Sequence, residues 1–276
     1  MFNALPDHTS PISKRQLGAD YRAAALELLG RLGYGSARQI AKALWGCVTP
    51  STRKMATRML SRLIAEGLLV AKRDTGGVNG ERLVALTTAG TRQLTYLLAQ
   101  ARPHARDWLR HAHAHRTAAN SVFVAGCLEQ PEGLDAGCTE LEIRSADVPP
   151  HLSKFDFDLE GAPAQKIPDC IFNMAPGYIW VEVENNWRST KDFNKLIGFL
   201  RAMFYLKLPP FFAVWLVVTA PGAKTIGQRL RKALGPGDPH TDGRGRVLRE
   251  LDARILADKV QVFTLDRETL SLRAAG

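Results

Sequence analysis

Three acidic residues lie in a stretch that reads as two apolar strands joined by a turn, IPDCIFNMAPGYIWVEVENNW. Asp169 opens the first strand, and Glu182 and Glu184 alternate through the second, so the two glutamates share a face. Carboxylate oxygens are the ligands that a hard cation such as Mg²⁺ or Mn²⁺ prefers, and a bound metal lowers the pKa of its water. The spacing therefore predicts a divalent-metal site that hydrolyses a phosphodiester, unless the glutamates only face solvent.

A cationic side chain is needed beside such acids to orient the attacking water or to stabilise charge on the phosphate. The nuclease motif PD-x(n)-(D/E)xK has a lysine where this chain has Glu184. Lys191 and Lys195 follow on one side of the next predicted helix, and we expect Lys195 to be the catalytic base. The alternative is a site that has lost cleavage and only holds metal or DNA.

Further polar groups could supply additional ligands to this site. Glu140 or Glu142, on a predicted strand at 138–145, could supply an upstream acid, and Asn120 on the preceding helix is a weaker choice. The segment HAHAH places three histidines, His111, His113 and His115, at the start of a predicted helix. Alanine neighbours favour packing near a domain junction, or a phosphate contact, over a metal-ligand role.

The first part of the chain has the order of a winged helix-turn-helix domain. Helices are predicted over residues 21–33, over 37–45 after the cap Ser36, and from Ser51 or Thr52 to Gly67. LLVAKR and ERLVAL alternate like two strands around the glycine-rich DTGGVNG, and TTAGTRQLTYLLAQA returns to helix. The third helix would enter the major groove of DNA.

The third predicted helix carries an apolar stripe of Met55, Met59, Leu60, Leu63 and Ile64. Its other positions are donors for phosphates or base edges, and the predicted wing adds basic residues that contact the DNA backbone. The predicted DNA-binding residues are Arg53, Lys54, Thr57, Arg58, Ser61 and Arg62 on the helix and Lys72, Arg73 and Arg82 on the wing. A solvated basic face on a protein-binding domain is the alternative.

The second half predicts a mixed sheet. After a helix at 116–129, strands are expected at 138–145, in PDCIFNM and in YIWVEVE, followed by a helix at 190–206 and a strand in FFAVWLVVT. A helix at 224–234, a mobile loop at 235–250 and a strand at 259–265 complete the chain. A helix between two apolar strands implies a parallel crossover, and αβββαβ is the restriction-endonuclease-like order.

Charge is divided unequally along the 276 residues. Residues 1–120 hold 18 Lys and Arg against 7 Asp and Glu, a net charge of +11, and the remainder has a net charge of −1. Confinement of positive charge to one half favours a polyanionic partner for that half. The four cysteines form no CxxC pair, no apolar run approaches a bilayer span, and the first residues lack a secretion signal. We therefore expect a cytoplasmic protein without membrane partners.

The order of these motifs resembles the replication-relaxation family of plasmid and mobile-element proteins. The resemblance rests on STRKMATRMLSRLIAEGLLVAKR, LTTAG, LRHAHAHRTAANSVFVA, IPDCIF and WVEVENNWRSTKDFNKLIGFL, and it covers most of residues 20–220. The chain is also similar to MobC-class mobilisation relaxases, which pair a winged helix with a restriction-nuclease-like domain. The resemblance implies metal-site roles for Asp169, Glu182 and Glu184 and a catalytic role for Lys195.

Together these observations predict an α/β protein, α+β overall, in three parts. Residues 1–19 form a flexible segment, 20–104 a winged helix and 105–276 a restriction-endonuclease-like domain. The expected function is sequence-specific binding of double-stranded DNA at a plasmid origin or operator, with metal-dependent nicking or relaxation. The alternative is a non-catalytic accessory protein or transcriptional regulator with a degenerate nuclease domain. Other replication or relaxosome proteins and a second copy of the chain are further expected partners.

Overall fold

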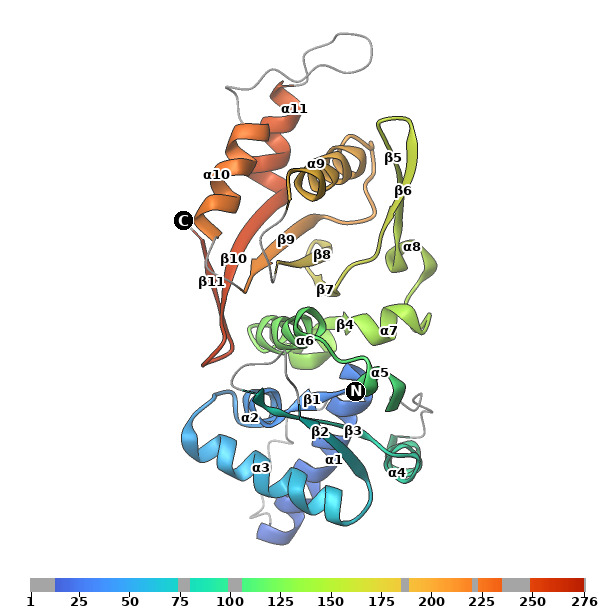
Figure 1. The fold of residues 1–276 in the computed structure, drawn as a ribbon, viewed down its shortest axis with the longest axis vertical. Helices are drawn as coiled ribbons and strands as arrows, with labels where there is room; N and C mark the ends of the chain where they lie inside the picture. Colours follow the sequence, from blue (N-terminus) through green and yellow to red (C-terminus); the bar gives the residue numbers. More distant parts are fainter. Residues whose placement is uncertain are drawn as a thin grey trace. The chain divides into compact units, whose positions relative to one another are not determined.

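The computed structural model describes residues 13–73, 80–98, 106–184, 189–219, 223–234 and 249–275 (Figure 1). The chain divides into two compact units, Met1–Glu142 with Asp266–Ser271, and Ile143–Leu265 with Leu272–Gly276. The first unit extends to Glu142, beyond the domain boundary predicted after residue 104. Most of the predicted wing tip and of the predicted 235–250 loop lies outside the described residues.

The first unit is mainly helical. Its helices are α1 (Lys14–Leu32), α2 (Ala37–Trp45), α3 (Pro50–Ala65), α4 (Thr88–Leu98), α5 (Arg106–Arg110) and α6 (Ala114–Cys127), and its strands are β1 (Gly35–Ser36), β2 (Leu69–Arg73), β3 (Arg82–Leu86) and β4 (Gly137–Thr139). Helix α1 begins within the segment predicted to be flexible, because the Ser13 hydroxyl accepts a hydrogen bond from the Gln16 N–H and caps it.

A three-stranded sheet in the order β1-β3-β2 lies within this unit. Strand β3 pairs antiparallel with both neighbours, and its residues Leu83, Val84, Ala85 and Leu86 are buried. Helix α1 packs against β3 and α4, so one core serves the helices and the sheet. The succession of three helices and a pair of antiparallel strands follows the sequence expectation.

The second unit contains a mixed sheet. Its strands are β5 (Phe155–Leu159), β6 (Ala162–Lys166), β7 (Cys170–Met174), β8 (Gly177–Glu184), β9 (Ala213–Val218), β10 (Val260–Asp266) and β11 (Ser271–Ala274), and its helices are α8 (Pro150–Ser153), α9 (Thr190–Phe204), α10 (Ala223–Leu234) and α11 (Arg249–Arg254). The sheet runs in the order β11-β10-β9-β8-β7. Strand β8 pairs antiparallel with β7 and parallel with β9, which pairs parallel with β10. The predicted mixed α/β character is confirmed.

The segment predicted as a strand at 138–145 is mostly helix, and that prediction is wrong. After β4, residues 140–144 form α7 (Glu140–Arg144). The Thr139 hydroxyl accepts a hydrogen bond from the Glu142 N–H at 3.2 Å, and the Glu142 carboxylate accepts one from the Thr139 N–H at 2.9 Å. This reciprocal capping box starts a helix, and it overrides the alternation of apolar residues.

Strands β5 and β6 form a separate two-stranded ribbon that the sequence analysis did not identify. Glu160 and Gly161 join the two strands, and both have positive φ angles, as two-residue hairpin turns require. Phe155 and Phe157 of β5 contact the ring of Phe199 on α9, with ring centroids 5.8 and 5.9 Å apart. The ribbon therefore covers part of α9.

Candidate nucleic-acid interface and acidic site

Helix α3 begins with a capping box of its own. The Thr49 hydroxyl accepts from the Thr52 N–H, the Thr52 side chain accepts from the Thr49 N–H, and Pro50 takes the first helical position. The cap is thus earlier than the predicted Ser51 or Thr52. Ala56, Leu60 and Leu63 are buried on the inner face of the helix. Met55 is 43% exposed, so its assignment to the apolar stripe is wrong.

The outer face of α3 presents most of the predicted DNA-binding residues to solvent. Its exposed polar side chains are those of Lys54, Thr57, Arg58, Ser61 and Arg62. Arg53 is half-buried. The Thr57 hydroxyl donates to the Arg53 carbonyl at 2.8 Å, which turns this side chain toward its own helix. The face therefore offers three exposed cations, Lys54, Arg58 and Arg62.

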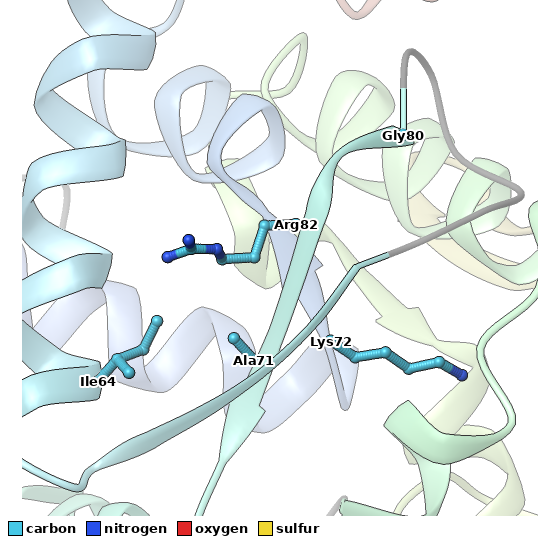
Figure 2. Close-up of a pocket in the computed structure, with 5 residues that line it drawn as sticks. All are labelled: Ile64, Ala71, Lys72, Gly80 and Arg82. Atoms are coloured by element: carbon cyan, nitrogen blue, oxygen red, sulfur yellow. The ribbon is translucent and has the colours of Figure 1, made fainter.

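The two strands that follow α3 direct their cations to opposite sides. Figure 2 shows Arg82 and Ala71 pointing toward Ile64 of α3, while Lys72 extends the other way. These residues and Gly80 line an open hollow of about 540 Å³. The Lys72 ammonium donates to the Arg110 carbonyl at 2.7 Å, at the end of α5, where a cation stabilises the helix. Arg82 is therefore the described wing cation that faces α3.

Arg73 was also predicted to contact DNA. Its backbone pairs with that of Arg82 across the strands, and its side chain lies outside the described part of the structure.

An acid, Glu81, lies among these cations. Its carboxylate accepts a hydrogen bond from Arg38 Nε at 2.8 Å and lies 4.0 Å from Arg53 Nη2. Arg38 is 2% exposed, and its Nη1 also donates to the Glu268 carboxylate at 2.7 Å. Burial lowers the pKa of Arg38, but the hydrogen bonds that it donates to the Glu268 and Glu81 carboxylates raise that pKa by more, so the net pKa lies above its ordinary value.

The acidic residues of β8 are buried, so the alternative in which they face solvent is wrong. Glu182 is 5% exposed and Glu184 is 4% exposed. Trp180 lies on the same face of β8, and its ring packs against Phe199 of α9 with centroids 4.9 Å apart. The cover over this face comes from α9, the helix that follows β8 in the sequence.

Both carboxylate oxygens of Glu182 are bonded within the protein. Oε1 accepts from Trp180 Nε1 at 2.7 Å, and Oε2 is bonded to the ammonium of Lys166. The Lys166 side chain is only 11% exposed and lies 5.1 Å from the centre of the Phe199 ring. Glu182 is therefore the anion of a buried ion pair.

Sequence reasoning missed Lys166. It ends β6, a strand that was not predicted, and it is 16 residues before Glu182. A signal for it lies in the hairpin, where FDFDL and APAQK alternate on either side of a two-residue turn. Lys195, the expected cation, is half-buried on α9, while the cation bonded to Glu182 is Lys166.

Asp169 uses its side chain to extend the strand pairing. Its Oδ2 accepts from the Val183 N–H at 2.7 Å, and its own N–H donates to the Val181 carbonyl at 3.0 Å. Within the described residues, no three His, Cys, Asp or Glu side chains are grouped so that they could hold a metal ion. A metal at Glu182 would have to displace the Lys166 ammonium from Oε2.

The upstream residues considered as extra ligands have structural partners in the first unit. Glu142 is bonded to Arg31 at 2.7 Å and Glu140 to Arg116 at 3.0 Å, both in buried pairs. The Asn120 amide donates to the Tyr34 carbonyl at 2.8 Å. Because these partners occupy the side chains, the three residues hold the first unit together.

The histidines lie at the beginning of α6. This helix begins at Ala114, so His111 and His113 precede it rather than lying inside a helix. His113 Nδ1 accepts from the Arg116 N–H at 3.3 Å and caps the helix. The His113 and His115 rings stack with centroids 6.2 Å apart.

No protein-family profile matches the chain, and no curated protein matches it. A solved structure, protein VC1899 from Vibrio cholerae, aligns with 79% of this chain at 13% sequence identity and a TM-score of 0.28. The chain spans about half of that protein, 49% of its length. In the described part of the chain, no helix is long and apolar enough to cross a membrane.

Proposed function

We propose that the chain binds double-stranded DNA through the outer face of α3 and the strand pair β2–β3. The observation that carries the proposal is the exposure of Lys54, Arg58 and Arg62 along one helix face, together with the exposed Arg82 of β3, which points toward α3 (Figure 2). Such donors neutralise phosphates, and the release of counterions from DNA drives association. The order of three helices and two antiparallel strands supports a winged helix-turn-helix arrangement, which presents its third helix to the major groove.

The charge distribution supports the same partner. The net charge of +11 lies in residues 1–120, which include α3 and both strands. A polyanion attracts such a surface over a Debye length of about 8 Å at physiological ionic strength. A protein partner with an acidic surface would exploit the same field, but it would lack the regular phosphate spacing that sets the salt dependence of DNA binding.

Fluorescence anisotropy of a labelled duplex across a salt series tests the proposal. Replacement of one phosphate-binding cation, in Arg58→Ala or Arg62→Ala, should flatten the slope of log K against log salt by about 0.9. Lys207→Ala, which removes an exposed cation from the second unit, is the charge-matched control and should leave the slope unchanged. Binding that ignores both salt and the α3 substitutions would refute the proposal.

For the second unit, we favour a non-catalytic role in a DNA-binding accessory protein or regulator. The supporting observation is that Lys166 and Trp180 together occupy both oxygens of Glu182. Under this proposal the unit serves docking to replication or mobilisation proteins, or pairing of two copies. Action at a plasmid origin or operator follows from the family resemblance alone and stays a prediction.

Metal-dependent nicking remains the competing prediction, and the shared buried face of Glu182 and Glu184 is what favours it. Isothermal titration of Mn²⁺ into wild type and Asp169→Asn, with nicking of supercoiled plasmid as a second readout, separates the two roles. The non-catalytic role predicts no specific metal binding and no nicking. Nicking that Mn²⁺ supports and Asp169→Asn abolishes would establish the enzyme instead.

A further inference from the structure

Glu81 is an anion in a surface that is otherwise suited to phosphate. It immediately precedes the exposed Arg82 at the start of β3, and its side chain is 14% exposed. Its Oε1 lies 2.8 Å from Arg38 Nε and 4.0 Å from Arg53 Nη2, so the carboxylate lies between a buried guanidinium and one on α3. A carboxylate in this place repels phosphate, so its role differs from those of the cations around it.

Arg38 holds this carboxylate in place. Besides its bond to Glu81, its Nη1 donates to the Glu268 carboxylate at 2.7 Å and to the carbonyls of Arg267 and Glu268 at 3.1 Å. A guanidinium with several fixed acceptors has little rotational freedom left. Glu81 is therefore a fixed negative charge, and the more mobile partner in its contact with α3 is Arg53, whose side chain is 44% exposed.

The position of Arg53 on its helix matters for DNA recognition. It lies in the first turn of α3, and Thr49 caps that turn. In a helix that enters the major groove, the N-terminal residues contact base edges. An arginine there pairs with guanine through the O6 and N7 acceptors, and that bidentate contact needs a correctly oriented guanidinium. A fixed carboxylate on one side of Arg53 provides the orientation and keeps phosphates away from it.

We infer that Arg53 reads a guanine in the major groove and that Glu81 is the positioning residue that makes this contact specific. This inference rests on the proposed DNA binding and adds a base preference to it. Arg58, Arg62 and Arg82, by contrast, contact the DNA backbone. Removal of the Glu81 charge should therefore weaken discrimination between sequences while it strengthens binding to DNA as a whole. A merely structural role for Glu81 would not produce those opposite changes.

Selection from a pool of randomised duplexes tests the inference with the full chain. Wild type should enrich a guanine at one fixed position, preferred over the other bases about 5- to 150-fold. Arg53→Lys keeps the charge but loses the planar fork, so it should lose the guanine preference and keep the salt slope. Glu81→Gln should reduce the preference about fivefold and tighten binding to random-sequence DNA about two- to fivefold.

The controls separate this inference from the proposed function. Arg58→Ala should weaken binding to all sequences equally and leave the guanine preference intact. Glu81→Gln retains an oxygen that can accept a hydrogen bond from Arg38 Nε, and its thermal unfolding is compared with that of wild type. If Glu81→Gln does not fold, the result for Arg53→Lys decides whether the inference stands. Salt-dependent binding by wild type without a guanine preference, or a preference that persists in Arg53→Lys or in a folded Glu81→Gln, overturns the inference and leaves DNA binding standing. Absence of salt-dependent binding by wild type overturns both.

Discussion

Helix α3 carries its charges on the outside of the first unit, whereas strand β8 carries its acids inside the second. Lys54, Arg58 and Arg62 are exposed to water, which screens them and leaves them available to an external partner. Glu182 lies in a layer of aromatic rings and is bonded to Lys166 and Trp180. The cost of burying that charge is offset only while both partners stay in place.

The difference shows that charged residues can have two distinct physical roles, the binding of an external ligand or the maintenance of the fold. An exposed charge contributes little to the free energy of unfolding but much to the binding of an oppositely charged ligand. A buried, bonded charge is unavailable to an external ligand because its hydrogen-bonding atoms are already occupied by the chain, and the fold loses stability when one partner is removed. Four substitutions test this contrast, in order of decreasing effect on the free energy of unfolding.

The largest effect is expected for Lys166→Met. It leaves the buried Glu182 carboxylate without its cation, and removal of one partner of a buried pair costs about 3–5 kcal/mol. Denaturant unfolding measures the loss. The double variant Lys166→Met with Glu182→Leu should recover most of the stability, because an apolar pair needs no desolvation of charge. A cost below about 1 kcal/mol for Lys166→Met would mean that water reaches the pair.

A smaller loss is expected for Trp180→Phe. Phenylalanine keeps an aromatic contact with Phe199, but Oε1 of Glu182 loses its hydrogen-bond donor. This loss should lower the free energy of unfolding by about 1–3 kcal/mol. Trp215→Phe is the matched control, because its ring also packs between aromatic neighbours, Phe172 and Phe263. Equal losses in the two variants, measured by denaturant unfolding, would contradict a role for the hydrogen bond.

Tyr205→Phe tests another buried acid of the second unit, Asp252, and adds a pH dependence. The Tyr205 hydroxyl donates to Asp252 at 2.6 Å, and loss of this bond should cost about 1 kcal/mol. Burial, followed by the bond to Asp252, raises the pKa of Tyr205. Because the folded-state pKa is raised, this contribution is complete below the ordinary tyrosine pKa of about 10 and declines as the pH rises above it. Unfolding measured from pH 8 to 11 should show a steeper decline in wild type than in Tyr205→Phe.

The smallest effect on stability is expected for Arg58→Ala, within about 0.5 kcal/mol of wild type in thermal unfolding. The same variant should weaken DNA binding, as described above. DNA binding would then change while the stability of the fold does not. A stability loss larger than that of Tyr205→Phe would place Arg58 among the structural charges and remove the contrast between α3 and β8.

Local signals in the sequence located many of the elements. Helix α2 begins after Ser36 and ends at Trp45 as predicted, because its cap and its apolar spacing agree. Strand β8 and helix α9 also lie where long runs of alternation and helical periodicity predicted them. The helix at 140–144 was missed because the apolar residues of ELEIR alternate as in a strand, and the deciding bonds between Thr139 and Glu142 form only when the chain turns.

For the two sites, the sequence alone determined which residues carry charge. It also determined that the cations gather in the first half of the chain and that the three acids belong to two neighbouring strands. Those properties depend on residue identity and on patterns only a few positions long. Only the tertiary structure decided which cation meets which acid: Lys166 rather than Lys195 is bonded to Glu182, Lys72 is bonded to α5, and Glu81 lies beside Arg53. Pairings of this kind form when distant segments pack together, because a long side chain has many rotamers and packing selects the one whose charge is satisfied.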